Sequence, residues 1–407
     1  MKMTNDNKII LFAKCTSGDP ITTENQIREI AECGMNLINL VVPADGNLMQ
    51  NLMKWCAKYD LKVLWTDYPV YNNFTAEDLS ESVRPYLYSP VTWGLYVKDE
   101  PNSADFEHLK NLTKIFNETV NTGDNTYKEP FINIFPMYAN EKQLGNSTYL
   151  EHVEQFLDIV QPKLCSVDIY PLNTTGLYKD YMRNLDIVAT GTRKRGIELS
   201  VYIQSVSFSP TKRTPSFADL KWQAYCCLSF GAKGIRYFTY MTPYSSKENF
   251  KPALIDHELK KTDRWYYAQE LNNEINSISS VFTQYKNLGA FNFNYSEEFK
   301  YLDFDNQYKD FDLIEDIECK NPLLFGCFEK EDNGIADGKA AEAFTIVNMT
   351  DLQSNNGESD VSIKLSSAKD VTAYVKGVPQ KLIEDSDGYI SITLGVGEGV
   401  FITCEWR

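Results

Sequence analysis

The sequence predicts a (β/α)8 TIM barrel of the α/β class, followed by a C-terminal antiparallel β-sandwich. From residue 8 to about 285, short apolar runs alternate eight times with amphipathic helical patterns. Strands that alternate with helices imply a parallel sheet covered by helices, and eight such units match the usual size of this barrel. After residue 286 the apolar pattern changes to period two. We therefore expect a catalytic barrel over 1–285 and a β-sandwich domain over 286–407.

Each expected barrel element follows from its own pattern. The first helix begins at Thr22 or Thr23, which are good N-caps, and ends before Gly34, which suits a helix C-terminus. The later helices repeat the amphipathic pattern between apolar runs. Strands are expected at 8–15, 35–43, 61–69, 91–101, 131–139, 163–171, 197–205 and 232–240, and helices at 22–34, 47–60, 75–88, 105–119, 148–160, 177–194, 216–231 and 264–285.

Two further patterns support this architecture. An open doubly wound sheet would place a glycine-rich phosphate turn after the first strand, but the segment "KCTSGDP" lacks the GxGxxG spacing. In the C-terminal part, "AFTIVNMT", "DVSIKLSS" and "YISITL" alternate as half-buried strands do, and "SDG" at 386–388 is a hairpin turn signal. The barrel with a sandwich is therefore the favoured arrangement.

Composition restricts the partners and the compartment. The formal net charge of −16 argues against nucleic acid and anionic membranes, which need a basic face. No apolar stretch is long enough to span a bilayer. The nine cysteines form no CxxC pair, and several lie in apolar patterns, which indicates free buried thiols in a reducing compartment. We expect a cytoplasmic protein; export with a signal peptide removed is the alternative.

The C-terminal ends of the strands form the mouth of such a barrel, where active sites of this fold lie. Side chains alternate between the barrel interior and the helix layer. On the fourth strand this alternation directs Lys98 and Glu100 inward, and it places Asp168 and Gln204 in the same mouth. The candidate catalytic residues are Glu100, Asp168 and Asp99, and the candidate substrate-binding residues are Trp65, Asp67, Tyr138, Tyr170, Gln204 and Tyr240.

Two inward carboxylates in a cleft lined by aromatic rings are the arrangement that glycoside cleavage needs. One carboxyl, with its pKa raised by burial, protonates the leaving oxygen, while the other stabilises or attacks the oxocarbenium-like carbon. Flat aromatic rings suit the CH faces of a pyranose. We therefore expect a carbohydrate substrate, with Glu100 as the general acid.

These residues also have structural interpretations. Asp99 and Glu100 could cap the next helix, although Asn102 is better placed to do so. Asp168 could be an ion-pair partner of Lys98, and the aromatic residues could be ordinary core. A Lys98 ammonium beside Glu100 would lower the pKa of a general acid. We therefore expect Lys98 to pair with Asp168 or to lie one layer below.

Metal and cofactor chemistry are not expected. His108, His152 and His257 fall on helices or a late loop, so the strand ends lack the ligands of a metallohydrolase. The sequence contains no GxSxG motif and no P-loop. We predict a site that uses neither a metal nor a cofactor.

Four segments carry a resemblance to known proteins. "YVKDEPN", "SVDIYPL", "VYIQSVSF" and "LKWQAYCCLSFGAKGIRYFTYMTP" resemble bacterial TIM-barrel glycoside hydrolase-like proteins, loosely related to family 42 β-galactosidases. The resemblance covers most of the barrel, and a β-sandwich tail is usual in that group. It implies a glycosidase in which Glu100 matches the acid/base of strand four. Asp99 stands where that clan usually has Asn.

Gln204 departs from the family pattern. The clan's nucleophile is a Glu that ends strand seven, and a neutral amide cannot act as that nucleophile. Ile169 also stands where similar proteins tend to have His. Three possibilities stay open: Asp168 as the second carboxylate; a substrate-assisted N-acetylhexosaminidase-type mechanism, in which Asp99 orients the acetamido group and Glu100 is the acid; and a non-catalytic barrel that binds glycan. The sugar, the linkage and the oligomeric state do not follow from the sequence.

Overall fold

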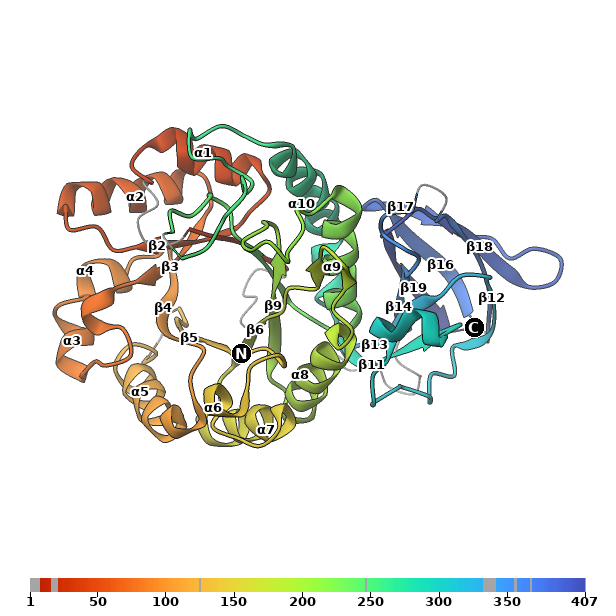
Figure 1. Ribbon diagram of the computed structural model, residues 1–407, viewed down its shortest axis with the longest axis horizontal. Coiled ribbons are helices and arrows are strands. Elements are labelled where there is room, and N and C mark those ends of the chain that lie inside the picture. Colours follow the sequence, from red (N-terminus) through yellow and green to blue (C-terminus); the bar gives the residue numbers. More distant parts are fainter. Residues whose placement is uncertain are drawn as a thin grey trace.

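The computed structural model describes residues 8–15, 21–123, 126–245, 247–331, 342–354, 357–366 and 368–406. It confirms the predicted fold: parallel strands form a closed barrel inside a ring of helices, and antiparallel sheets lie to one side (Figure 1). Sequential strands are neighbours around the barrel, and β10 closes it against β1. The barrel strands are β1 (Ile10–Lys14), β2 (Leu37–Val41), β3 (Lys62–Thr66), β4 (Thr92–Asp99), β5 (Glu129–Ile134), β6 (Leu164–Asp168), β9 (Glu198–Gln204) and β10 (Gly234–Phe238).

The helices of the barrel begin where the sequence supplies capping residues. Thr23 caps α1 in a capping box with Gln26, and Ser216 caps α9 in the same way with Asp219, which satisfies backbone N–H groups of each first turn. The expected helix at 75–88 is two short helices, α3 and α4. The helices are α1 (Glu24–Glu32), α2 (Gly46–Lys58), α3 (Ala76–Ser80), α4 (Arg84–Leu87), α5 (Phe106–Thr119), α6 (Glu141–Leu144), α7 (Tyr149–Val160), α8 (Tyr181–Arg195), α9 (Phe217–Ser229) and α10 (Asp263–Phe282), with short 3-10 turns at Tyr68–Val70, Ser103–Asp105 and Glu297–Leu302.

Large side chains fill the barrel interior below the mouth. Phe12 and Tyr202 meet edge to face at 5.8 Å, and so do Tyr96 and Phe131 at 4.9 Å. The buried guanidinium of Arg236 lies 4.2 Å from the ring centre of Phe131, and its Nε donates a 2.6 Å hydrogen bond to Ser200. The interior below the mouth is therefore a packed core.

The C-terminal strands form two sheets that enclose a second apolar core. A six-stranded sheet has the order β11-β13-β14-β19-β16-β17, and a three-stranded sheet has the order β12-β15-β18. Buried residues from both sheets, among them Phe325, Phe344 and Ile363, form one cluster between them. The strands are β11 (Tyr285–Phe293), β12 (Ile314–Glu318), β13 (Leu323–Lys330), β14 (Glu342–Asn348), β15 (Ser359–Leu365), β16 (Ala368–Val375), β17 (Val378–Lys381), β18 (Tyr389–Leu394) and β19 (Gly399–Trp406), and a small hairpin after β6 contains β7 (Leu172–Asn173) and β8 (Gly176–Leu177).

The sandwich packs against the barrel through the outer face of its larger sheet. Strands β13, β14 and β19 contact α9, and Figure 1 shows the sandwich beside α8, α9 and α10. The Trp222 indole N–H of α9 lies 3.2 Å from the Met349 sulfur, and the hydroxyls of Ser229 and Thr345 are 2.7 Å apart. Phe401 and Trp222 belong to the same buried cluster as the barrel's outer core. The two parts therefore share a buried apolar interface.

Gly326 provides a test of this interface. A Cβ added at Gly326 would lie 2.6 Å from the Ser229 Cα of α9, where backbone cannot yield easily. Gly326→Ala is expected to lower the free energy of unfolding by about 1–3 kcal/mol, the usual cost of overpacking a core. Urea denaturation measures this loss. Gly123→Ala is the control, because a Cβ added at Gly123 has no atom within 4 Å. Its φ of +64° adds only a local backbone cost. A Gly326→Ala protein as stable as wild type would contradict the close packing.

Two other sequence predictions concern cysteines and membranes. Among the described residues the cysteines are free thiols, and all of them except the half-buried Cys319 are buried, as the apolar patterns around Cys165, Cys226 and Cys404 indicated. Within the same residues, no helix combines the length and apolar character that a membrane crossing requires.

Candidate active site

A β-bulge in β4 determines which side chains reach the mouth. The register between β4 and β5 shifts between Tyr96 and Lys98, so one extra residue is inserted in β4. The prediction that Lys98 points inward and pairs with Asp168 is therefore wrong: its ammonium instead lies 3.8 Å from the Asp105 carboxylate beside α5. Asp99 takes the inward position. The bulge thus places a carboxylate where simple alternation placed an amine.

Asp99 is held by three polar groups. The Tyr96 hydroxyl donates a 2.9 Å hydrogen bond to Oδ1 of Asp99, and the Asn133 amide approaches the same oxygen at 3.3 Å. The Lys14 ammonium lies 3.9 Å from Oδ2. The Asp99 backbone N–H also donates to the Tyr71 hydroxyl at 2.7 Å. These contacts fix the orientation of the Asp99 carboxylate.

Glu100 follows the bulge in an unusual backbone conformation. Its φ is +45°, a region that residues other than glycine rarely adopt and that occurs at functional sites. Its N–H donates to the Asn133 carbonyl at 2.8 Å, which ties it to β5. Asn102, rather than Asp99 or Glu100, caps the turn that follows by accepting from the Ala104 N–H. The interpretation of the pair as a helix cap is therefore wrong.

The carboxyls of Asp168 and Glu100 both have raised pKa values. Asp168 is 7% exposed, and its Oδ1 accepts a 2.8 Å hydrogen bond from Asn133. Loss of surrounding solvent raises the pKa of Glu100, and repulsion from Asp168 and Asp99 raises it further. Burial and the Asp99 charge likewise raise the pKa of Asp168, while the Asn133 hydrogen bond opposes this. Because two nearby carboxylates resist double ionisation, the pair retains a proton at a pH where an ordinary carboxyl has lost it.

Lys14, the last residue of β1, was missed in the sequence analysis. Its ammonium lies 5.0 Å from the Tyr96 ring centre and 5.4 Å from that of Tyr202. Burial lowers the pKa of Lys14, but electrostatic interactions with Tyr202, Asp99 and Asp168 outweigh it and raise that pKa above its ordinary value. Lys14 is therefore the charged amine of the mouth. A signal was available, because Lys14 shares the inward face of β1 with Phe12.

A cavity of about 440 Å³ opens beside this cluster. Asp99 and Lys14 stand at its inner wall, and tyrosine rings stand at its rim, with Tyr68 55% and Tyr244 67% exposed. The Tyr244 ring stacks on His257 with their centres 4.3 Å apart, which supports one face of that tyrosine. The lining residues are Lys14, Cys15, Asn39, Val41, Thr66, Tyr68, Tyr71, Tyr96, Asp99, Phe238, Pro243, Tyr244, Ser245, Glu248 and Phe250.

Three of the residues expected to bind substrate lie outside the mouth. Trp65 is fully buried in the helix layer, where its indole N–H donates to Thr92 at 2.9 Å. Asp67 lies on the same side of the chain and accepts a 2.6 Å hydrogen bond from Tyr86. Alternation along β3 directs Leu64 and Thr66 inward instead. The expectation that Trp65 and Asp67 face the mouth is wrong.

The third such residue is Tyr240. Its hydroxyl accepts a 3.1 Å hydrogen bond from the Trp265 indole of α10, and its ring is buried in the outer core. Strand β10 ends at Phe238, so alternation no longer applies two residues later. Phe238 lines the cavity where Tyr240 was expected.

Tyr138 and Tyr170 do lie near the carboxylates. Tyr170 is buried, and its ring stacks on Phe238 with centres 5.0 Å apart. Tyr138 is 46% exposed and meets Tyr178 edge to face at 5.7 Å. The pKa of the Tyr138 hydroxyl is raised by burial and by the charges of Asp168 and Glu100. The mouth thus has an aromatic wall next to the carboxyl pair.

Gln204 ends β9 as expected, but its amide binds protein rather than the cavity. Its Oε1 accepts from the Leu172 N–H at 3.0 Å, and its Nε2 donates to the Arg213 carbonyl at 3.1 Å. Its side chain is fully buried. The amide therefore joins the loop after β6 to the loop after β9. It does not present a polar atom to a ligand.

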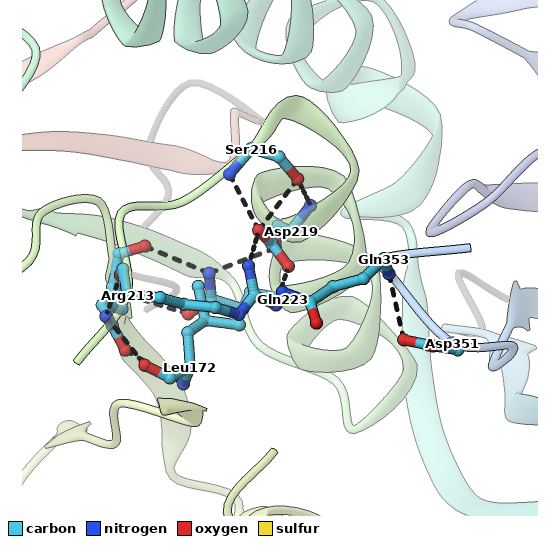
Figure 2. A network of polar contacts seen from close by, with 8 residues as sticks. Leu172, Arg213, Ser216, Asp219, Gln223, Asp351 and Gln353 are labelled. Atoms are coloured by element: carbon cyan, nitrogen blue, oxygen red, sulfur yellow. Dashed lines mark hydrogen bonds and ion pairs between the residues drawn. The ribbon is translucent and has the colours of Figure 1, made fainter. Parts of the chain in front are cut away.

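A second layer of polar contacts holds Gln204 in place. The Gln223 side chain of α9 accepts from the Gln204 N–H at 2.8 Å and donates to its carbonyl at 3.1 Å. The Arg213 guanidinium forms a bidentate ion pair with Asp219. Figure 2 shows Arg213, Asp219 and Gln223 within one network of polar contacts. The end of β9 is therefore a structural joint.

In the described part of the chain, no group of three or more His, Cys, Asp and Glu side chains is arranged to hold a metal ion. The carboxylates of the mouth instead interact with Lys14, Asn133 and tyrosine hydroxyls.

No known protein family and no curated protein matches the sequence. Solved structures resemble the fold. A catalytic mutant of a GH42 β-galactosidase from G. stearothermophilus aligns with a TM-score of 0.56 and 9% identity over 100% of this chain and 99% of that chain. A family 39 glycoside hydrolase from Bacteroides cellulosilyticus has a TM-score of 0.50 and 12% identity over 98% of this chain and 81% of that chain. For the β-galactosidase from Marinomonas ef1 the TM-score is 0.47 at 9% identity, over 67% of this chain and 61% of that chain.

At these identities the likeness shows the fold alone.

Proposed function

We propose that this chain is a glycoside hydrolase that uses Glu100 and Asp168 as its two catalytic carboxyls. The observation that carries the proposal is that burial and neighbouring carboxylates raise the pKa of both carboxyls, which stand at the C-terminal ends of β4 and β6. The fold neighbours named as β-galactosidase and family 39 glycoside hydrolase support the same class. A carbohydrate or glycoside is the proposed substrate.

The environments of the two carboxyls suggest different roles. Burial raises the pKa of Asp168, but its carboxylate accepts the Asn133 hydrogen bond, which supports the ionised form. Glu100 is more exposed than Asp168, and its carboxyl accepts no hydrogen bond within the described part of the chain. We therefore assign the proton to Glu100 as general acid. Asp168 is the carboxylate that stabilises or attacks the oxocarbenium-like carbon.

The substrate-assisted mechanism requires Asp99 to orient an acetamido group. One Asp99 oxygen already accepts from Tyr96 and Asn133, so a single oxygen remains for an acetamido N–H. That arrangement keeps this mechanism as the alternative for N-acetylhexosaminides. A glycan-binding barrel without turnover is the candidate from another class, and the structural use of Gln204 at the end of β9 favours it.

A panel of nitrophenyl glycosides that includes N-acetylhexosaminides tests these proposals. Turnover of plain glycosides that is lost in Asp168→Asn supports the two-carboxyl mechanism. Turnover restricted to N-acetylhexosaminides and lost in Asp99→Asn supports substrate assistance. Binding of glycosides without any turnover would replace the hydrolase by the glycan-binding protein.

The proposed mechanism also predicts the response to chelators. Acid catalysis by Glu100 and charge stabilisation by Asp168 need no Lewis acid. We expect turnover to be unchanged by EDTA, measured on the best substrate of the panel before and after dialysis. Complete loss of turnover that a divalent ion restores would contradict the assignment of the site.

A further inference from the structure

Lys14 brings unused hydrogen-bonding capacity to the mouth. An ammonium has three donors, and within the described part of the chain Lys14 makes no hydrogen bond through them. Its distance of 3.9 Å to Asp99 Oδ2 is too long for a hydrogen bond, so neither group satisfies the other. Both groups line the 440 Å³ cavity. The cavity wall therefore presents a free donor next to a free acceptor.

We propose that Lys14 and Asp99 together bind two neighbouring hydroxyls of a neutral sugar ring. This inference rests on the proposed function, since it describes how that site holds its substrate. A sugar hydroxyl both donates and accepts, so one can accept from the Lys14 ammonium while its neighbour donates to Asp99 Oδ2. Hydrogen bonds to charged groups are stronger than neutral ones. The pair therefore selects a ring with two adjacent free hydroxyls.

The charges around the cavity favour a neutral sugar over an anionic one. Lys14 is balanced by Asp99, and Glu248 adds a second carboxylate to the lining. A uronic acid in this cavity would meet one ammonium and two carboxylates, and like charges disfavour that contact.

Aromatic rings at the rim complete the binding surface. Tyr68 and Tyr244 are exposed members of the lining, and His257 supports one face of Tyr244. Such supported rings stack on the apolar face of a pyranose while its hydroxyls point to the inner wall. The cavity thus offers stacking at its rim and paired hydroxyl recognition at its base.

The test measures binding rather than turnover. Dissociation constants are determined by ligand-observed NMR for methyl glucoside, methyl galactoside, methyl mannoside and each of their monodeoxy analogues, with methyl glucuronide as the anionic probe. For wild type, removal of either of two adjacent hydroxyls from a bound parent sugar is expected to weaken binding by roughly 10- to 100-fold, because each hydroxyl forms a hydrogen bond to a charged group. Methyl glucuronide is expected to bind more weakly than methyl glucoside.

Variants then assign the effect to Lys14. Lys14→Met should weaken the parent sugar by the same factor and remove the difference between the parent and the deoxy analogue that lacks the Lys14-bound hydroxyl. Lys98→Met is the matched control, since that ammonium pairs with Asp105 outside the mouth, and it should bind like wild type. Circular dichroism verifies that each variant is folded. If a variant does not fold, binding of the deoxy analogues to wild type still tests the inference.

Several results would overturn the inference. One is that the deoxy analogues bind wild type as tightly as their parent sugars. Another is that a folded Lys14→Met protein still binds the parent sugar more tightly than the deoxy analogue. The third is that wild type binds none of the parent sugars. The results separate this inference from the proposed function. If nitrophenyl glycosides are turned over but the deoxy analogues bind as well as their parents, hydroxyl binding by Lys14 and Asp99 is refuted and the hydrolase proposal stands. If the deoxy analogues bind more weakly but no glycoside is turned over, the hydrolase proposal is refuted and the hydroxyl binding stands.

Discussion

Glu100→Gln is expected to lower the rate on glycosides with poor leaving groups by about 10²–10⁴-fold, the range that general acid catalysis contributes. The substitution preserves shape and removes the proton donor. Glycosides with good leaving groups should suffer less, because their departure needs little protonation. Lys98→Met, outside the mouth, serves as the control. A Glu100→Gln protein with wild-type rates on poor leaving groups would show that the acid lies elsewhere.

The pH profile of the same enzymes follows from the raised pKa values. Glu100 must be protonated, so activity is lost as the pH rises above the raised pKa of the pair. Asp168 must be ionised, so activity is lost as the pH falls through the lower step of the pair. A bell-shaped profile is expected for wild type. The alkaline limb should disappear in Glu100→Gln, measured on an activated substrate that retains turnover.

Gln204→Glu is expected to destabilise the fold by about 3 kcal/mol or more at pH 8, and to add no nucleophile. The new carboxylate would be fully buried and would face the Arg213 and Leu172 carbonyls, to which the amide now donates. Burial would raise its pKa in the folded state above the unfolded value. The stability loss should therefore increase as the pH rises above the ordinary carboxyl pKa, so it should be smaller at pH 5 than at pH 8.

Urea denaturation at the two pH values measures this effect. Gln204→Met is the matched control: it leaves the Leu172 N–H without its partner at about 1–3 kcal/mol, and this cost should not depend on pH. A Gln204→Glu protein that is as stable as wild type and gains turnover would mean that this position is a nucleophile site. In that case the two-carboxyl assignment to Glu100 and Asp168 would be wrong.

The barrel could be predicted from the sequence because periodicity averages over many residues. Eight repeats of strand and helix survive local irregularity, and so does the change to period two after residue 286. The placement of Tyr138, Tyr170 and Asp168 near one another also followed from the shared C-terminal ends of the strands. These inferences need only the type and order of the elements.

Individual side chains were harder to place, because a single irregular residue reverses an alternation. The bulge in β4 exchanged the roles of Lys98 and Asp99. The end of β10 at Phe238 removed Tyr240 from the mouth. Neither event has a sequence signal of its own, since both depend on how neighbouring strands pair. Trp65 and Asp67 differ, because alternation along β3 would have excluded them.

The apolar interface between the larger sheet and α9 has a consequence for whether this chain can be divided into separate domains. In many multidomain enzymes the accessory domain is a module, which can be exchanged because its contacts with the catalytic domain are few and polar. Here the outer face of α9 depends on β13, β14 and β19 for its burial, and Trp222 on one side and Phe401 on the other lie in one core. Recombination of this barrel with a different tail would have to carry the matching face of the sheet along with it.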